Sequence, residues 1–252
     1  DFLVGIGDDQ IDLEWSDLEG YRAAIHKRGV AINIAPLVGH GTLRIASMGL
    51  LESAPTPEDL ELMGELLKLS FNQGAFGMST GLTYVPSRYA PFEELVYLCR
   101  VIKESGRTYT SHARDYDIFG DDFFLGPLKE AFALARETGV RVQFSHAAIN
   151  NPSLWGRAQD WVDLFDSPKA KNLDVAFDVY PYNASSSALT QYLPDWVQAG
   201  GVEAMKERLS DSATFKRAAE ELSLGWSAHK IKWMWDRVVI ARGNGLLGVE
   251  NG

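Results

Sequence analysis

Two stretches of the chain end on the same Ser-His step. TYTSH (108–112) places His112 at the end of an alternating, strand-like run, and VQFSH (142–146) places His146 at the end of the next one. Neutral imidazole is a good zinc ligand, with nitrogen-to-metal distances of roughly 2.0–2.1 Å. Matching positions on neighbouring strands would let both rings reach one ion, because parallel strands lie about 4.8 Å apart. The alternative is that each histidine only caps its strand through local hydrogen bonds.

Two further polar residues lie close to strand ends. Asp178, in LDVAFDVYPY, could bind metal, act as a base or orient a neighbouring group. Arg114 follows His112 by two positions and could bind a carboxylate through both arms of its guanidinium. A salt bridge to Asp115 or Asp117 is the alternative for Arg114.

The remaining candidates are less specific. YPYNASSSALT (180–190) is either a polar rim for a substrate or an ordinary turn. His40 either lines the same site or hydrogen-bonds the loop backbone between its two glycines, and the tight turn favours the second role. His26 and His229 lie away from any strand end, so we expect them to be structural or solvated.

Helical and strand-like segments alternate along the chain, and the clearest helix begins at Thr56 with Pro57 behind it. The predicted helices are 16–29, 56–74, 90–106, 127–139, 153–167, 202–209 and 212–222, and the predicted strands are 30–41, 75–80, 108–112, 142–146 and 173–182. Such alternation predicts an α/β fold of parallel strands with right-handed crossovers. Glycine-rich nucleotide motifs are missing after the strands, which favours an incomplete (β/α)8 TIM barrel. In such a barrel, strand-end side chains face the active site.

Composition narrows the class of protein. The 252 residues are 46% hydrophobic, which suits one large domain. The net charge of −10, without a Lys/Arg run, argues against nucleic acid and anionic membranes as partners. No membrane-length apolar run or signal peptide is recognised, so we expect a cytoplasmic protein. The single cysteine, Cys99, excludes an internal disulfide and is expected to pack as a small apolar residue.

The chain begins without Met and stops in a glycine-rich stretch, ARGNGLLGVENG, so we expect a fragment of a longer protein. An incomplete barrel would leave open sheet edges. Such edges pair readily with other strands, so self-association through the open edge is expected.

Six segments together resemble the N-acyl-D-amino-acid deacylases (D-aminoacylases) of the amidohydrolase superfamily. They are NIAPLVGHGTLR, GAFGMSTGLTYVPSRYA, YTSHARDYD, VQFSH, DVYPYNASSSALT and LPDWVQAGG, in this order across nearly the whole chain. The resemblance implies a zinc-dependent TIM barrel that hydrolyses N-acyl-D-amino acids to a carboxylate and a free D-amino acid. Residues 1–252 would form a single partial catalytic domain, about strands 3–7, in which 183–245 cover the active site as an insertion.

The resemblance also implies roles for single residues. His112 and His146 match two zinc-binding histidines of strands five and six. The substrate-binding candidates are Arg114, Tyr84, Tyr180, Tyr182 and Ser186. The family's first-strand His-x-His pair, metal-bridging cysteine and general-base Asp find no match in this sequence, and Cys99 lies in a predicted helix. We therefore assign no catalytic residue and expect this chain alone to be inactive and to bind zinc weakly at best.

One departure from the family affects the substrate class. Ala148 stands where the family usually has a Lys that faces the substrate carboxylate. Two other functions remain open. A related amidohydrolase would cleave cyclic amides such as hydantoins, although that branch commonly carries a metal-bridging lysine on strand four and GAFGMST has none. A degenerate, non-catalytic barrel would serve binding or assembly.

Overall fold

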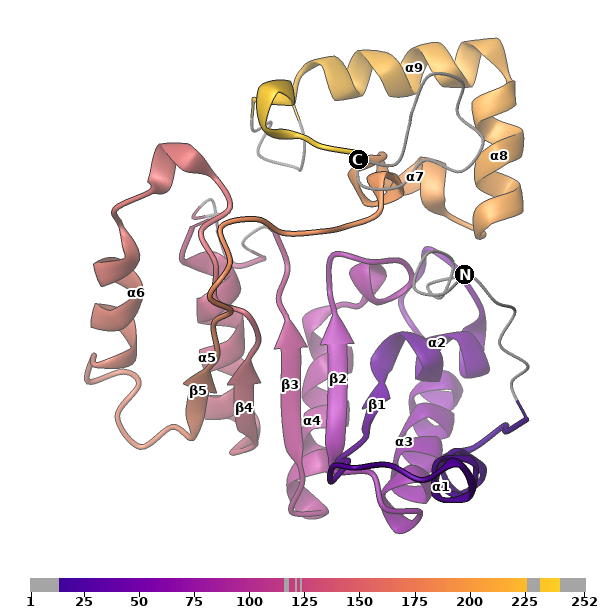
Figure 1. Cartoon of the computed structure of the whole chain (residues 1–252), viewed down its shortest axis with the longest axis vertical. Coiled ribbons are helices and arrows are strands. Elements are labelled where there is room, and N and C mark those ends of the chain that lie inside the picture. The colour runs from indigo at the N-terminus through magenta and orange to yellow at the C-terminus, as the bar shows by residue number, and fades with distance from the viewer. Residues whose placement is uncertain (1–13, 116–117, 121, 123, 226–231, 241–252) are drawn as a thin grey trace.

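Five parallel strands form the centre of the molecule. The computed structural model describes residues 14–115, 118–120, 122, 124–225 and 232–240 (Figure 1). The strands are β1 (Leu37–Gly39), β2 (Gly77–Gly81), β3 (Thr108–His112), β4 (Arg141–Phe144) and β5 (Val175–Phe177). They lie in chain order in one sheet, each parallel to the next. This arrangement confirms the α/β prediction.

Helices precede, connect and follow the strands along the chain. They are α1 (Leu18–Arg28), α2 (His40–Met48), α3 (Pro57–Asn72), α4 (Phe92–Glu104), α5 (Gly126–Thr138), α6 (Ala158–Phe165), α7 (Asp195–Gln198), α8 (Val202–Ser210) and α9 (Ser212–Ser223), with short 3-10 turns η1 (Ser87–Tyr89), η2 (Pro152–Leu154), η3 (Leu189–Tyr192) and η4 (Trp235–Arg237). In Figure 1, α4 and α5 lie behind the strands, and α7 to α9 lie beyond their carboxyl ends. No helix in the described part of the chain combines the length and apolarity of a membrane span.

Helix α3 shows how the sequence specifies its own boundaries. The Thr56 hydroxyl accepts a hydrogen bond from the Asp59 amide at 3.2 Å, and the Asp59 carboxylate accepts one from the Thr56 amide at 2.9 Å. This reciprocal capping box satisfies two amides at the helix start that have no partner within the helix. Met63 and Leu67 are fully buried on the predicted apolar face. Burying each stabilises the fold by about 1.5–3 kcal/mol relative to exposure.

Helix α4 confirms the packing role of Cys99. The thiol is fully buried in the core, and burial raises its pKa. A protonated, buried thiol is a poor nucleophile and a poor metal ligand.

The strand predicted over 30–41 is mostly wrong, since only Leu37–Gly39 pairs. Leu37 stands opposite Gly77, and the residues before Gly77 belong to the turn that follows α3. Residues 30–35 therefore have no β2 residue to pair with, and Ile32 is 75% exposed. An apolar run needs a partner strand to become a strand.

The other boundaries shift less. Strand 173–182 shortens to β5, and helix 153–167 divides into η2 and α6. Helix α1 begins two residues later than predicted and is capped by Asp17, whose side chain accepts from the Gly20 amide. The extended stretch RVVIAR (237–242) forms no strand over its described residues, while 241 and 242 lie outside them.

Candidate metal-binding site

His112 and His146 meet beyond the carboxyl ends of β3 and β4. His112 Nδ1 lies 2.9 Å from His146 Nε2, and the ring centroids are 4.5 Å apart with the rings edge to face. The distance joins the two imidazoles by a hydrogen bond. The predicted convergence of the two histidines is therefore present in the structure.

The two histidines do not occupy matching positions, and this part of the prediction is wrong. Ser111 stands opposite Phe144, which puts His112 level with Ser145 and leaves His146 one residue farther on. The Ser145 amide donates to the Ser111 carbonyl at 2.9 Å and continues that register. Side chains alternate between the faces of a strand, so regular extension would turn His146 to the same face as buried Phe144.

A left-handed backbone conformation at His146 resolves this mismatch. Its φ of +39° lies in a region that residues other than glycine rarely adopt. This turn replaces the regular alternation just past β4. The imidazole therefore meets His112 instead of following Phe144 toward the helices.

Asp178, for which the sequence left three roles open, hydrogen-bonds to this turn. Its carboxylate accepts from the His146 amide at 2.6 Å and from Gln143 Nε2 at 2.8 Å. Asp178 also bonds through its backbone, which donates to the Phe144 carbonyl and accepts from the Ala147 amide. Both carboxylate oxygens are thus engaged by protein groups.

The loop after β2 supplies contacts to the other ring. Thr83 Oγ1 lies 2.9 Å from His112 Nε2, and the Tyr84 ring centroid is 5.0 Å from that of His112. Burial raises the pKa of Tyr84, so its hydroxyl stays protonated. The sequence placed Tyr84 near a substrate but did not single out Thr83. A hydroxyl residue two positions after a strand end was the available signal.

The electrostatics favour a neutral imidazole at His112. Burial, together with the nearby His146, lowers the pKa of His112 to about 4. At neutral pH the ring therefore offers a lone pair instead of a positive charge. If Nε2 carries the proton and donates to Thr83, Nδ1 is the free ligand atom.

The residues present fit a zinc ion in part. Two nitrogens on one tetrahedral zinc lie about 3.3 Å apart, close to the observed 2.9 Å. Binding through both would require His146 to carry its proton on Nδ1, because its Nε2 would bind the metal. The structure assembles no group of three or more His, Cys, Asp or Glu side chains suited to a metal within the residues it describes. The pair therefore provides two ligands of a site.

Arg114 does not take the predicted position. Its Nε donates to both Glu130 oxygens at 3.0 and 3.1 Å, and its terminal nitrogens donate to the carbonyls of Arg88 and Ala90. The side chain is 1% exposed. This burial contradicts the predicted contact with a substrate carboxylate. The ion pair of Arg114 among the described residues is with Glu130 and not with Asp115, while Asp117 lies outside the described residues. Charge desolvation explains the placement, because a buried guanidinium requires a carboxylate and carbonyl partners.

The tyrosines after β5 lie on the other side of the pair. The Tyr180 ring centroid is 6.4 Å from that of His146, and Tyr182 stacks on Tyr180 at 6.1 Å. Tyr182 is 75% exposed, and Ser186 lies in the exposed stretch that follows. Tyr180 is thus beside the site, while contacts of Tyr182 and Ser186 with a substrate stay predictions.

His40 has neither predicted role. It opens α2 and is fully buried, with Nδ1 2.9 Å from Ser87 Oγ and Nε2 2.7 Å from Glu94 Oε1. Arg44 pairs with the second oxygen of Glu94. His40 therefore bonds side chains instead of the loop backbone, as part of a buried network under η1.

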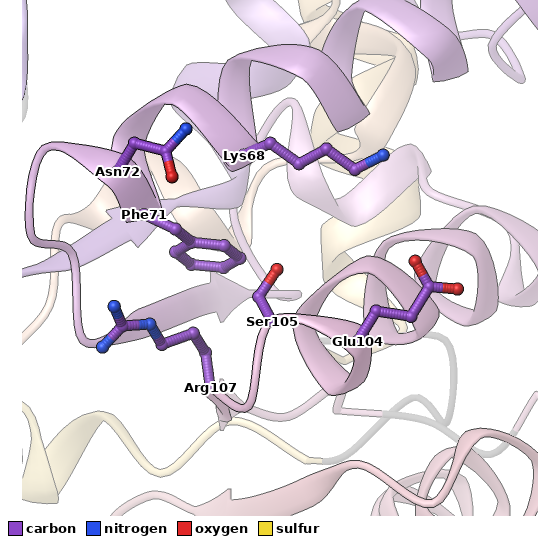
Figure 2. Close-up of a pocket in the computed structure, with 6 residues that line it drawn as sticks. All are labelled: Lys68, Phe71, Asn72, Glu104, Ser105 and Arg107. Atoms are coloured by element: carbon purple, nitrogen blue, oxygen red, sulfur yellow. The ribbon is translucent and has the colours of Figure 1, made fainter.

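The hollow drawn in Figure 2 lies at the other end of the strands. Its volume is about 410 Å³, and it is lined by Lys68, Phe71, Asn72, Glu104, Ser105 and Arg107. Arg107 directly precedes β3, whose opposite end carries His112. In a parallel α/β sheet, chemistry is carried at the carboxyl ends of the strands, so this hollow is separate from the candidate site.

The chain is similar to known proteins over about two thirds of its length. The chain is 35% identical to the D-aminoacylase of Alcaligenes xylosoxydans xylosoxydans over 171 residues, covering 68% of the chain and 34% of that protein. It is 34% identical to the N-acyl-D-glutamate deacylase of the same organism over 187 residues, covering 74% and 37% respectively. No protein-family model matches the chain.

Solved structures show the same relation. The N-acyl-D-glutamate deacylase from Bordetella bronchiseptica, solved with zinc and a phosphonate mimic of the tetrahedral intermediate, matches with a TM-score of 0.62 and 34% identity over 70% of this chain and 36% of that one. A D-aminoacylase that defines a subset of amidohydrolases matches with a TM-score of 0.60 and 32% identity over 66% and 34% respectively.

The chain spans about a third of the length of these relatives. Over that third, the similarity in sequence agrees with the similarity in fold. The chain is a homologue of the N-acyl-D-amino-acid deacylases of the amidohydrolase superfamily, related to them along this segment.

Proposed function

We propose that this chain contributes to a zinc-dependent deacylase that hydrolyses the amide bond of N-acyl-D-amino acids. The observation that carries the proposal is the His112–His146 pair, whose nitrogens lie 2.9 Å apart at the carboxyl ends of two parallel strands. The relatives named D-aminoacylase and N-acyl-D-glutamate deacylase supply the reaction and substrate class. The fold we propose for the whole protein is a (β/α)8 barrel.

Each residue near the pair has a distinct role in this proposal. His112 and His146 hold zinc, which when bound acts as a Lewis acid toward the amide carbonyl and activates water. Thr83 keeps the outer nitrogen of His112 occupied, leaving Nδ1 for the metal. Tyr84 and Tyr180 border the substrate on opposite sides of the pair, and Tyr182 and Ser186 belong to its polar rim.

The segment 183–245 is proposed to cover the site within a single catalytic domain over 1–252. Two contacts support this role within its described part. Arg88 donates to the Gln191 carbonyl at 3.3 Å, and the Tyr89 hydroxyl donates to the Asp195 carbonyl at 3.1 Å. Both join the segment to η1, next to the loop that carries Thr83. Helices α7 to α9 lie beyond the carboxyl ends of the strands in Figure 1.

A test of the metal role uses the full-length protein. His146→Ala should lower the bound zinc and reduce N-acyl-D-amino-acid hydrolysis by at least about 100-fold, because it removes a ligand. His26→Ala, which alters an exposed histidine on α1, is the matched control and should retain both. Zinc content is measured by elemental analysis and activity by release of free D-amino acid. Wild-type zinc and activity in a folded His146→Ala protein would disprove the assignment.

The isolated 252-residue chain is proposed to be inactive. It offers two histidine ligands, and the described residues assemble no group of three. Two ligands hold zinc weakly compared with the four-coordinate sites of enzymes. We expect no turnover in a screen of N-acyl-D-amino acids with added zinc. Turnover that disappears in His146→Ala would contradict this expectation.

The sheet edges support a further proposal, that copies of the chain associate. Val30, Ile32 and Leu37 are exposed at and before the β1 edge, and Phe177 is exposed on β5. Exposed apolar residues beside an unpaired strand edge favour pairing with a second copy.

A further inference from the structure

The left-handed turn that carries His146 is held by residues outside the metal-ligand pair. We propose that Asp178 is a positioning residue, whose carboxylate fixes the His146 backbone so that the imidazole faces His112 and not the helices. Gln143 supports it by holding the second carboxylate oxygen. The metal-binding half of this inference rests on the proposed function, whereas the backbone half does not.

The need for such a residue follows from the register of the strands. Ser111 opposes Phe144, so a regular continuation would place the side chain of His146 on the face opposite to that of His112. The φ of +39° is unfavourable for a residue with a Cβ. Such conformations persist where the surrounding structure holds them in place.

The contacts of Asp178 act on both sides of the turn. Its carboxylate accepts from the His146 amide at 2.6 Å, and its carbonyl accepts from the amide of Ala147 at 2.7 Å. Its own amide donates to the Phe144 carbonyl at 3.1 Å, which fixes Asp178 to the end of β4. Asp178 therefore hydrogen-bonds to residues on both sides of Ser145, namely Phe144 before it and His146 and Ala147 after it.

Gln143 makes the carboxylate a rigid support. Its side chain lies on the face that His112 also uses, because Thr110 opposes Gln143 in the register and His112 follows Thr110 by two positions. The 2.8 Å bond from Gln143 Nε2 occupies the carboxylate oxygen that His146 does not use. The carboxylate is then oriented by two donors, and its charge strengthens both bonds.

The test compares the two aspartates that flank β5, Asp174 before the strand and Asp178 after it. Asp178→Ala removes the acceptor for the His146 amide, whereas Asp174→Ala removes a carboxylate that pairs with exposed Arg141 at the other end of β4 and β5. Asp178→Asn keeps an oxygen that can accept from His146. Gln143→Ala removes only the hydrogen bond from Gln143 to the Asp178 carboxylate. This variant replaces Asp178→Ala in the test if Asp178→Ala does not fold.

Two measurements are made on the 252-residue chain. The first is the His146 amide proton shift in metal-free protein by NMR, which a bond to a carboxylate moves downfield. The second is the affinity for Zn²⁺, measured by competition with a chromophoric chelator. A general loss of stability at the sheet edge would not shift the His146 amide selectively.

We expect Asp178→Ala to move the His146 amide upfield and to weaken Zn²⁺ binding by about tenfold or more. Asp174→Ala should stay near wild type, whereas Asp178→Asn, which keeps an acceptor without the charge, and Gln143→Ala should fall between. An unchanged His146 amide shift in folded Asp178→Ala would overturn the inference. If only Gln143→Ala folds, an unchanged shift in that variant would do the same. An equal change of the His146 amide shift in Asp174→Ala would also overturn it. If the wild-type chain takes up no measurable Zn²⁺, the zinc content of full-length His146→Ala still decides the metal site, and the amide shift alone decides the role of Asp178.

Discussion

At the scale of single residues, the candidate site depends on two imidazoles held by different means. His112 ends a regular strand, and its outer nitrogen is engaged by Thr83. His146 lies beyond its strand in a strained conformation, and Asp178 holds its backbone. Side-chain contacts thus orient one ring and backbone contacts the other, so substitutions around them should affect metal binding through different routes.

A residue-scale prediction concerns the buried His40. Burial lowers its pKa below 6.5, despite the opposing effect of Glu94, so the folded protein prefers the neutral ring. The unfolded chain then binds more protons, and stability present above about pH 6.5 is lost as the pH falls below it. Each such group contributes a slope of up to about 1.4 kcal/mol per pH unit. His112, whose pKa is also lowered, adds in the same direction.

Urea unfolding between pH 7.5 and 5 measures this slope. His40→Gln should be less stable than wild type at pH 7.5 and should show a smaller loss on acidification. His26→Gln, at an exposed position of α1, should keep the wild-type slope. If His40→Gln and wild type lose stability in parallel, His40 is not responsible.

At the scale of elements, the parallel strands and their crossover helices place polar residues at the carboxyl ends of the strands. The loop between β2 and α4 carries Thr83 and continues into η1. Two buried side chains, His40 and Arg114, hydrogen-bond to η1 and to the residue that follows it. Ser87 contacts His40, and the carbonyls of Arg88 and Ala90 accept from Arg114. A buried arginine first considered for a substrate thus holds an element of the site.

An element-scale prediction concerns the start of α3. Thr56→Ala removes the side-chain half of the capping box and should destabilise the protein by about 1 kcal/mol. For a chain of this size that loss lowers the melting temperature by about 2–4 °C. Ser212→Ala is the control, because Asp211 and not Ser212 caps α9. Equal melting temperatures for Thr56→Ala and wild type would show that the cap does not contribute.

At the scale of the whole molecule, the described residues form one parallel sheet with helices behind it and α7 to α9 beyond its carboxyl ends (Figure 1). The sheet edge at β1 and the strand β5 expose apolar side chains. Two hydrogen bonds join η1, next to the Thr83 loop, to the segment around α7: Arg88 donates to the Gln191 carbonyl and Tyr89 to the Asp195 carbonyl. These two contacts join residues 103 and 106 positions apart in the sequence.

The whole-molecule prediction is self-association of the 252-residue chain. Light scattering should give a mass above 27.9 kDa that decreases on dilution. Ile32→Lys, which places a charge beside the β1 edge, should reduce the association. Leu224→Lys changes a residue that is similarly exposed, at 64%, but lies away from the sheet, and it should not. A wild-type chain that stays monomeric and folded at high concentration would refute the prediction.

The local features of this protein follow from the amino-acid sequence alone. Capping residues and apolar spacing were sufficient to locate α3, and the alternating run TYTSH was sufficient to place His112 at a strand end. The burial of Cys99 followed from its apolar helical surroundings. These features depend on neighbouring residues in the chain, so periodicity and turn chemistry contain the information needed.

How residues distant in the sequence meet depends on the folded chain. The one-residue offset between His112 and His146 follows from the β3–β4 register, which neither stretch specifies alone. Likewise, Arg114 turns to Glu130 and His40 to Glu94 because buried polar groups require partners, and those partners come from other helices. The repeated Ser-His step indicated the ligands, whereas the left-handed turn at His146 is what brings them together.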